Sequence, residues 1–336
     1  MKAAILGAGA WGTALAKLLA EKGADVSLWA RRPQLAESIA RLRENAQYLS
    51  GIPLPTNVFV THDVRQAVRD AGAVVFAVPS QAMREVAQAA RPHLARRALV
   101  LGATKGIETG SLLFMDEVLD LELGAAIGER LAVLSGPSFA RELAERHPTA
   151  VVIAARDPQV CGAGIDLLRT SYFRTYASED IVGVECGGAL KNVIAIAAGA
   201  VQGLGFGQNS RAALITRGLA EIARLAVARG GSALTLAGLA GVGDLVLTCT
   251  GDLSRNRAVG FELGRGRQLA DVLAGLGHVA EGVGTAKSAN RIADKLGVDM
   301  PISAAVHAVV HEGKPVRQAV TDLMARELGY ELERSG

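Results

Sequence analysis

Three glycines near the start of the chain, Gly7, Gly9 and Gly12, have the spacing of a turn that binds a dinucleotide. They follow an apolar segment expected to be a strand and precede one expected to be a helix, which is the context the pattern requires. The first glycine permits a tight turn, the second lets a pyrophosphate approach the main chain, and the third allows close packing of helix on strand. The helix N-terminus would then present free N–H groups to the phosphates. We interpret the turn as a dinucleotide site; the alternative is a loop in which the glycines serve turn geometry alone.

Two adjacent arginines follow the second expected strand, where a side chain normally selects the coenzyme. This segment has no acid that could bind both ribose hydroxyls of NAD. The guanidinium groups of Arg31 and Arg32 instead suit the 2′-phosphate of NADP, because arginine gives bidentate, charge-assisted hydrogen bonds. We therefore expect NADPH to be preferred or at least accepted, with NAD also possible. The alternative is that both arginines are solvated residues at the entry of the next helix.

A lysine and an asparagine, Lys191 and Asn192, interrupt a long apolar segment. A partly desolvated ammonium group has a pKa lowered toward neutrality and can donate and recover a proton during the reduction of a carbonyl group. The alternative is a lysine that is ion-paired, or whose stem merely covers apolar surface. Lys105 lies just beyond the carboxyl end of an expected strand, where open α/β sheets bind ligands, although a lone surface lysine is common.

A second cationic cluster, Arg255 and Arg257, lies in the first turn of an expected helix for which Ser254 is a suitable N-cap. Cations at this end oppose the helix dipole, so the pair suggests an anion supplied from elsewhere, such as a substrate phosphate or part of the coenzyme. The alternative is that these arginines pair with Asp244 or Asp252.

The pattern of elements predicts an α/β fold, in which an N-terminal, Rossmann-like, doubly wound parallel sheet is followed by an all-helical domain. We place the dinucleotide-binding domain at residues 1–178 and the all-α substrate-binding domain at residues 179–336. Most of the expected strands are apolar throughout, as in sheets covered on both faces; they are Ala3 to Leu6, Asp25 to Trp29, Ala73 to Val78, Ala98 to Gly102, Ala132 to Leu134 and Ala150 to Ala154. The expected C-terminal helices are Ile181 to Ala200, Ser210 to Arg229, Ser254 to Leu263, Leu269 to Leu276, Thr285 to Leu296 and Ile302 to Val310.

Composition excludes several classes of function. With 36 Lys and Arg against 33 Asp and Glu, the chain gives no reason to expect a nucleic-acid surface. Three cysteines without a CxxC spacing favour the cytoplasm and argue against a disulfide scaffold. The histidines have no metal-binding spacing, so we expect no metal, and the pair His307 and His311 is interpreted as incidental. The glycines interrupt the N-terminal apolar run, which disfavours a secretory signal, and the longest apolar run, Val193 to Val201, is far shorter than the roughly 18 residues of a membrane span.

Taken together, the motifs resemble those of the bacterial-type NAD(P)-dependent glycerol-3-phosphate dehydrogenases over nearly the whole chain. The motifs that carry the resemblance occur in the order of that family; they are Gly7 to Gly12, Ala103 to Gly106, Ser135 to Ala140, Gly187 to Val193, Leu214 to Gly218, Gly241 to Leu245 and Ser254 to Arg257.

The resemblance implies roles for individual residues. Lys191 would be the proton donor and acceptor at the C2 oxygen of the substrate. The substrate site would contain Lys105, Gly136, Ser138, Lys191, Asn192, Asp244, Ser254, Arg255 and Asn256. The coenzyme site would contain Gly7, Gly9, Ala10, Trp11, Gly12, Arg31, Arg32, Lys105, Ala140, Arg255, Val279 and Glu281. Ala10 stands where many members of that family carry serine, so this chain lacks the hydroxyl that would bond to a phosphate there.

The hypothesis from sequence is the reversible, NAD(P)H-dependent reduction of dihydroxyacetone phosphate to sn-glycerol 3-phosphate, which supplies phospholipid synthesis. The resemblance also implies a homodimer. Two alternatives stay open: a related reductase of the β-hydroxyacid or ketopantoate type, whose substrate carries a carboxylate, and a non-catalytic sensor of NADPH. The phosphate-suited residues at Ser254 to Arg257 argue against the first, and a lysine within an apolar helix argues against the second.

Overall fold

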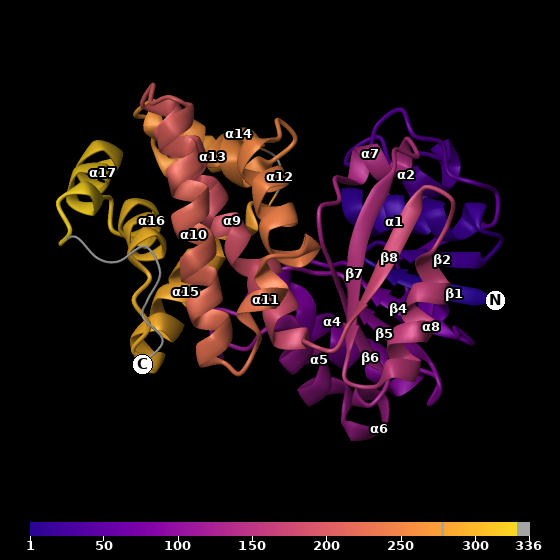
Figure 1. Cartoon of the computed structure of the whole chain (residues 1–336). Helices are drawn as coiled ribbons and strands as arrows, with labels where there is room; N and C mark the ends of the chain where they lie inside the picture. The colour runs from indigo at the N-terminus through magenta and orange to yellow at the C-terminus, as the bar shows by residue number, and fades with distance from the viewer. Residues whose placement is uncertain (277–278, 328–336) are drawn as a thin grey trace.

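A computed structural model describes residues 1–276 and 279–327 and contains an eight-stranded sheet followed by a set of helices (Figure 1). The strand order is β3-β2-β1-β4-β5-β6-β7-β8. The strands are β1 (Lys2–Leu6), β2 (Asp25–Trp29), β3 (Val58–Thr61), β4 (Ala73–Phe76), β5 (Leu99–Gly102), β6 (Leu131–Ser135), β7 (Thr149–Ala155) and β8 (Phe173–Ser178). The predicted fold class is confirmed.

The sheet differs from the prediction at three places. Strand β7 pairs antiparallel with β6, because the connection between them, with its short helix α7 (Ala140–Ala144), returns from the same edge of the sheet at which β6 ends. The other pairings are parallel. Strands β3 and β8 were not among the expected strands. Both lie at sheet edges and expose residues such as Phe59 and Tyr176, so neither has the uniformly apolar sequence of a central strand.

Helices cover both faces of the sheet (Figure 1). One apolar core joins α1 (Ala10–Glu21) and α8 (Pro158–Leu168) to side chains such as Ile5, Val26 and Leu28. Another joins α4 (Met83–Ala90) and α5 (Met115–Leu123) to Leu6, Val74 and Phe76. The helices of this half are α1 (Ala10–Glu21), α2 (Pro33–Leu42), α3 (Val64–Val68), α4 (Met83–Ala90), α5 (Met115–Leu123), α6 (Ala125–Gly128), α7 and α8 (Pro158–Leu168).

The C-terminal half is built around one long helix, α9 (Ile181–Gly203), which is buried along almost its whole length. The helices around it are α10 (Gln208–Ala228), α11 (Ala233–Leu236), α12 (Asp244–Thr250), α13 (Arg255–Gly264), α14 (Leu269–Leu276), α15 (Glu281–Leu296), α16 (Pro301–His311) and α17 (Val316–Met324). The six expected helices are confirmed, with boundaries shifted by a few residues. Helices α11, α12 and α17 were not expected.

Glycines on two helices allow α9 and α13 to pack with their backbones in contact. A Cβ atom at Gly260 would lie 1.8 Å from the carbonyl oxygen of Ile196, and one at Gly199 would lie 1.9 Å from that of Arg257. Gly203 and Gly264 continue the contact one turn further along. This close approach fixes the N-terminal end of α13 over the middle of α9, where Lys191 lies.

By length and composition, α9 could cross a membrane, with a mean hydropathy of 1.5. However, 89% of that apolar stretch is buried inside the protein, as in the core helix of a globular domain. The helix is therefore weak evidence for a membrane span.

The contact between α9 and α13 predicts that Gly260→Ala destabilises the protein. The added methyl group must displace the backbone of α9, so we expect the free energy of unfolding to fall by about 1–3 kcal/mol. Urea denaturation measures the change. Gly162→Ala in α8 is the matched control, because nothing lies within 4 Å of its added Cβ, and it should raise stability by about 0.5–1 kcal/mol. Equal effects of the two substitutions would contradict the proposed packing.

Candidate functional site

Two lysines and one aspartate form a buried cluster where the sheet half meets the helical half. The Nζ atom of Lys191, in the middle of α9, lies 2.5 Å from Oδ1 of Asp244, the first residue of α12. The Nζ atom of Lys105, beyond the end of β5, lies 2.6 Å from the other oxygen of Asp244 and donates to the carbonyl oxygen of Gly136 at 3.0 Å. One carboxylate thus holds two ammonium groups that come from different halves of the chain.

Burial and neighbouring charges together lower the pKa values of both Lys191 and Asp244. Burial, assisted by the neighbouring charge of Lys105, lowers the pKa of Lys191 to about 8, although Asp244 acts to raise it. Burial acts to raise the pKa of Asp244, but Lys105 and Lys191 outweigh it and hold that pKa below its usual value. Near neutral pH the cluster therefore carries an ionised Asp244 and a Lys191 that can both give up and regain a proton.

Adjacent glycines on α9 make room for this arrangement. A Cβ atom at Gly188 would lie 2.7 Å from Oγ of Ser135 and 3.4 Å from the Cγ atom of Lys105. A Cβ atom at Gly187 would lie 2.2 Å from the carbonyl oxygen of Ala240, just before α12. Any larger residue would push away the segments that carry Lys105 and Asp244.

The turn after β6 forms the sheet side of the cluster. Gly136 has a φ angle of +127°, which favours glycine, and a Cβ atom there would lie 3.0 Å from the Cα atom of Val151. Its carbonyl oxygen accepts hydrogen bonds from Lys105 and, at 3.0 Å, from the hydroxyl of Ser138. The turn therefore points a carbonyl group at the Lys105 ammonium.

A chain of amides links α9 to α13 and α15 beside Lys191. The side-chain nitrogen of Asn256 donates to Oδ1 of Asn192 at 2.9 Å, and the backbone N–H of Gly282 donates to Oδ1 of Asn256 at 3.0 Å. Both asparagines are buried. The structure thus brings Asn192 and Asn256 together, as the expected substrate site requires.

Two arginines at the start of α13, which were predicted to share an anion, have different surroundings. Ser254 is the N-cap, as expected, and its Oγ accepts from the N–H of Arg257 at 3.3 Å. Arg257 is already paired with Asp252 at 2.5 Å and with Gln202 at 2.7 Å, so the prediction of an outside anion is wrong for this residue. Arg255 is exposed. Desolvation nevertheless lowers its pKa, while Glu281 and Tyr48 act to raise it, which indicates that both groups lie near its guanidinium.

The three glycines of the first turn have different surroundings. Gly7 has a φ angle of +121°, and its added Cβ would lie 2.4 Å from the carbonyl oxygen of Ala77. A Cβ at Gly12 would lie 1.9 Å from the carbonyl oxygen of Gly7. Gly9, in contrast, faces open space, and as the N-cap of α1 it provides no side chain for the first N–H groups of the helix. Ala10 and Trp11 begin this helix. An uncapped helix end beside an open glycine fits the pyrophosphate of a dinucleotide.

The two arginines after β2 are both exposed but differ in their contacts. The Nη2 atom of Arg32 donates to Oε1 of Gln47 at 2.7 Å and to the hydroxyl of Tyr48 at 3.1 Å. No such contact involves Arg31 within the described ranges 1–276 and 279–327. Both guanidinium groups are therefore placed at the surface beyond β2, where the 2′-phosphate was predicted.

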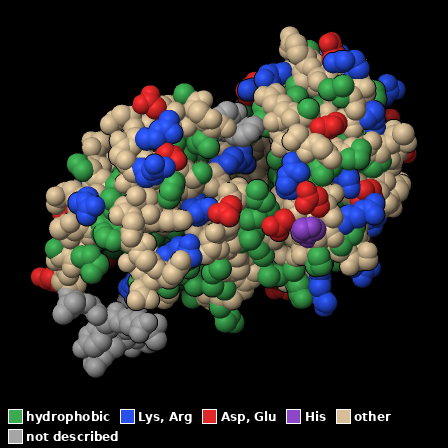
Figure 2. Space-filling view, turned by 90° about the horizontal axis from the view of Figure 1, so that it is seen from above, with side chains coloured by type: hydrophobic (Ala, Val, Ile, Leu, Met, Phe, Trp, Pro, Cys, Tyr) green, Lys and Arg blue, Asp and Glu red, His purple; other side chains and the backbone are tan. Residues whose placement is uncertain are grey.

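The remaining expected coenzyme residues come from both halves of the chain. Glu281, the first residue of α15, accepts the N–H of Ser80 at 3.1 Å and also its hydroxyl, which joins the segment after β4 to the helical half. Burial raises the pKa of Glu281. Ala140 and Trp11 are partly buried and each packs against the core that contains α1, whereas Val279 lies exposed just before α15. Figure 2 shows basic side chains on both sides of the hollow between the halves.

Sequence reasoning missed three residues of this region. Thr248 donates to the backbone oxygen of Asp244 at 2.6 Å and contacts Nζ of Lys191 at 2.9 Å. Its signal was a threonine four residues after Asp244, one helical turn along. Asn45 and Ser80 contact the glycine turn and Glu281 across long sequence separations, which no local pattern reveals.

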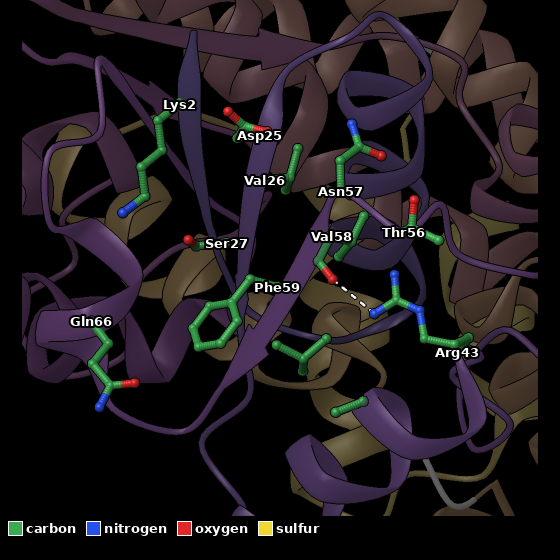
Figure 3. A pocket seen from close by; sticks show the side chains of 12 residues that line it. Lys2, Asp25, Val26, Ser27, Arg43, Thr56, Asn57, Val58, Phe59 and Gln66 are labelled. Carbon is green, nitrogen blue, oxygen red and sulfur yellow. Dashed lines mark hydrogen bonds between the residues drawn. The ribbon is translucent and has the colours of Figure 1, made fainter.

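A separate hollow over β2 and β3 is lined by none of the predicted site residues (Figure 3). It is lined by residues such as Lys2, Asp25 and Phe59, and the guanidinium of Arg43 at its rim donates to the carbonyl oxygen of Val58 at 2.9 Å. Neither the glycine turn nor the lysine cluster lines it. Within the described part of the chain, no group of three potential metal ligands occurs.

Together, a glycine turn at a helix end and a buried lysine cluster at the carboxyl edge of the sheet define an NAD(P)-dependent dehydrogenase with a Rossmann domain and a helical second domain. Two family models match the chain: the N-terminal part of NAD-dependent glycerol-3-phosphate dehydrogenase over residues 2–161 and its C-terminal part over residues 180–321. The chain belongs to this family.

Similar proteins cover nearly the whole length of the chain. It is 52% identical over 332 residues to glycerol-3-phosphate dehydrogenase [NAD(P)+] of Myxococcus xanthus, with 99% of each protein covered. It is also 52% identical over 330 residues to the protein of that name from Geobacter sp. strain M21, with 98% of each covered. Among solved structures, glycerol-3-phosphate dehydrogenase from Coxiella burnetii is 40% identical with a TM-score of 0.93, covering 97% of this chain and 99% of that one.

The shared carboxylate predicts that Asp244→Asn lowers the pKa of Lys191 further below about 8. Burial and the charge of Lys105 still disfavour the ammonium form, while the one opposing anion is lost. An NMR titration of the lysine side-chain nitrogens measures this pKa, and a Lys191→Met variant identifies the signal by removing it. An unchanged or raised pKa in Asp244→Asn would show that Asp244 does not govern the Lys191 charge.

Proposed function

We propose that the chain catalyses the reversible, NAD(P)H-dependent reduction of dihydroxyacetone phosphate to sn-glycerol 3-phosphate, and that the product supplies phospholipid synthesis. Family membership and the names of the relatives support this activity. The structural observation that carries it is the contact of Lys191 and Lys105 with one buried aspartate, between the expected coenzyme turn and the start of α13.

In the proposed mechanism, Lys191 is the proton donor and acceptor. Its ammonium group protonates the C2 oxygen of the ketone as negative charge develops there, and its pKa of about 8 lets the amine recover a proton afterwards. Lys105 places a second positive charge at the carboxylate of Asp244 and helps to polarise the C2 carbonyl group of the substrate. Asp244 holds both groups in position.

The phosphate end of the substrate is assigned to the start of α13. This ten-residue helix offers its N-terminal N–H groups and the guanidinium of Arg255, which the structure leaves exposed. Asn192, next to Lys191 in α9, accepts a hydrogen bond from Asn256 in the first turn of α13. Gly136 and Ser138 form the opposite side, and Ser254 shapes the helix start.

We assign coenzyme binding to Gly7, Gly9, Gly12 and the N-terminus of α1 for the pyrophosphate, and to Arg31 and Arg32 for the 2′-phosphate of NADPH. NADH remains an alternative coenzyme. When bound, the coenzyme supplies the hydride that reduces C2. The rest of the assigned contacts come from Ala10, Trp11, Lys105, Ala140, Arg255, Val279 and Glu281.

We further propose the boundary between the two domains at residues 178 and 179, supported by the end of β8 at Ser178 and the start of α9 at Ile181. A cytoplasmic location is supported by three free, buried cysteines. The homodimer stays a prediction from the family.

A spectrophotometric assay at 340 nm tests the proposed activity. We expect NADPH to be consumed with dihydroxyacetone phosphate and not with 2-keto acids, because the substrate site is suited to a phosphate. Consumption with keto acids alone would instead indicate a reductase of the ketopantoate type. Binding of NADPH without oxidation of it by either substrate would indicate a sensor.

Replacing Lys191 by alanine should lower kcat by about 10²- to 10⁴-fold, the usual contribution of a general acid, while leaving the Kd of NADPH nearly unchanged. Lys17→Ala is the matched control. Both lysine side chains are 10% exposed and lie 2.5 Å from a carboxylate oxygen, but Lys17 pairs with Glu21 at the far end of α1. A near-normal kcat in the Lys191 variant would refute the assigned role.

A further inference from the structure

The segment of residues 44–53, here called the strap, joins α2 to β3 as a closed loop. An isolated bridge between Glu44 and Pro53 closes its base, and the carboxylate of Glu44 accepts the N–H of Gly51 at 2.7 Å. Leu49 and Ile52 are buried in the core that also contains α1. The strap is thus a packed element rather than a loose connection.

One end of the strap holds the glycine turn. Asn45 is fully buried, and its Nδ2 atom donates to the carbonyl oxygen of Ala8 at 2.9 Å and to Oγ1 of Thr13 at 2.7 Å. Its Oδ1 atom accepts the N–H of Tyr48 at 3.3 Å. Ala8 lies between Gly7 and Gly9, so this amide fixes the turn against the first turns of α1.

The middle of the strap holds Arg32. Gln47 and Tyr48 both accept from Nη2 of this arginine, and its Cζ atom lies 5.9 Å from the centre of the Tyr48 ring. Among the described residues these hydrogen bonds use one terminal nitrogen, so the N–H groups of Nη1 and Nε are left to donate single, charge-assisted hydrogen bonds. Further along, the carbonyl oxygen of Ser50 accepts from Arg141 at 2.8 Å, next to Ala140.

We propose that the strap assembles the coenzyme site: Asn45 positions the glycine turn for the pyrophosphate, while Gln47 and Tyr48 aim Arg32 at the 2′-phosphate. Asn45 is therefore a positioning residue that acts on both coenzymes. Gln47 and Tyr48 set the preference for NADPH over NADH. This inference rests on the proposed use of NAD(P)H.

The first test compares Asn45→Ala with Asn57→Ala, using fluorescence titration of NADPH and of NADH without substrate. Asn57 is a matched control, because its Nδ2 donates to the carbonyl oxygens of Ala20 and Ala24 at the opposite end of α1. We expect the Kd of both coenzymes to rise about 10- to 100-fold in Asn45→Ala, as for a lost buried hydrogen-bonding group, and to stay within about twofold in Asn57→Ala.

A smaller change keeps the test valid if Asn45→Ala fails to fold. Thr13→Val removes one acceptor of the Asn45 amide, whereas Thr13→Ser keeps it. Weaker binding of both coenzymes in the valine variant, with recovery in the serine variant, supports the proposal. Equal binding by the two variants would overturn the role of Asn45.

The second test measures discrimination with the double variant Gln47→Leu/Tyr48→Phe. We expect the Kd of NADPH to rise about 3- to 10-fold, while that of NADH stays unchanged, because Arg32 loses its orientation but not its charge. Tyr176→Phe is the control, since the Cζ atom of Arg174 lies 5.1 Å from that ring on the edge strand β8. Equal changes for both coenzymes, or none, would overturn this part.

The two proposals fail in different ways. If the unmodified protein binds neither coenzyme, the proposed function fails. If it binds them and the Asn45 and Asn57 variants behave alike, only the role of the strap fails.

Discussion

The structure depends on one buried carboxylate that holds a buried ammonium group and a partly buried one. Asp244 is 1% exposed and Lys191 is 8% exposed, so each charge has lost most of its water. Such burial is tolerated only when the opposite charges are close and the remaining polar positions are hydrogen-bonded. Thr248 and the carbonyl of Gly136 complete that requirement. The cluster keeps an excess of one positive charge when both lysines are protonated, which favours an anionic or polarised ligand beside it.

The helical half is organised to deliver Lys191 to this cluster. An apolar helix that is buried on all sides can carry a charged group only where another element brings the counter-charge. Gly187 and Gly188 allow that approach, and Gly199 and Gly260 let α13 lie against α9, so that its N-terminal end reaches the same place. Small residues along these two helices thus occur where neighbouring segments come close enough to complete the ion cluster and the site beside it.

Local sequence patterns predicted the features that depend on residues close together in the sequence. The glycine turn, the long helices and the Ser254 cap follow from spacings of a few residues, and their positions could be read directly. The direction of β7 and the edge strands β3 and β8 depend on pairing with distant segments, so they could not. The same limit applies to the site: the pairing of Arg257 with Asp252 corrected the prediction, and the buried contacts of Asn45 bring together residues more than 30 positions apart.

The different surroundings of the three glycines separate the demands of folding from those of binding. Gly7 and Gly12 are enclosed by backbone atoms, whereas the space beside Gly9 is open and its φ angle of −76° suits any residue. A selection that scored only folded protein would accept side chains at Gly9 and reject them at its two neighbours in the motif. Intolerance at Gly9 would consequently reveal the ligand rather than the fold.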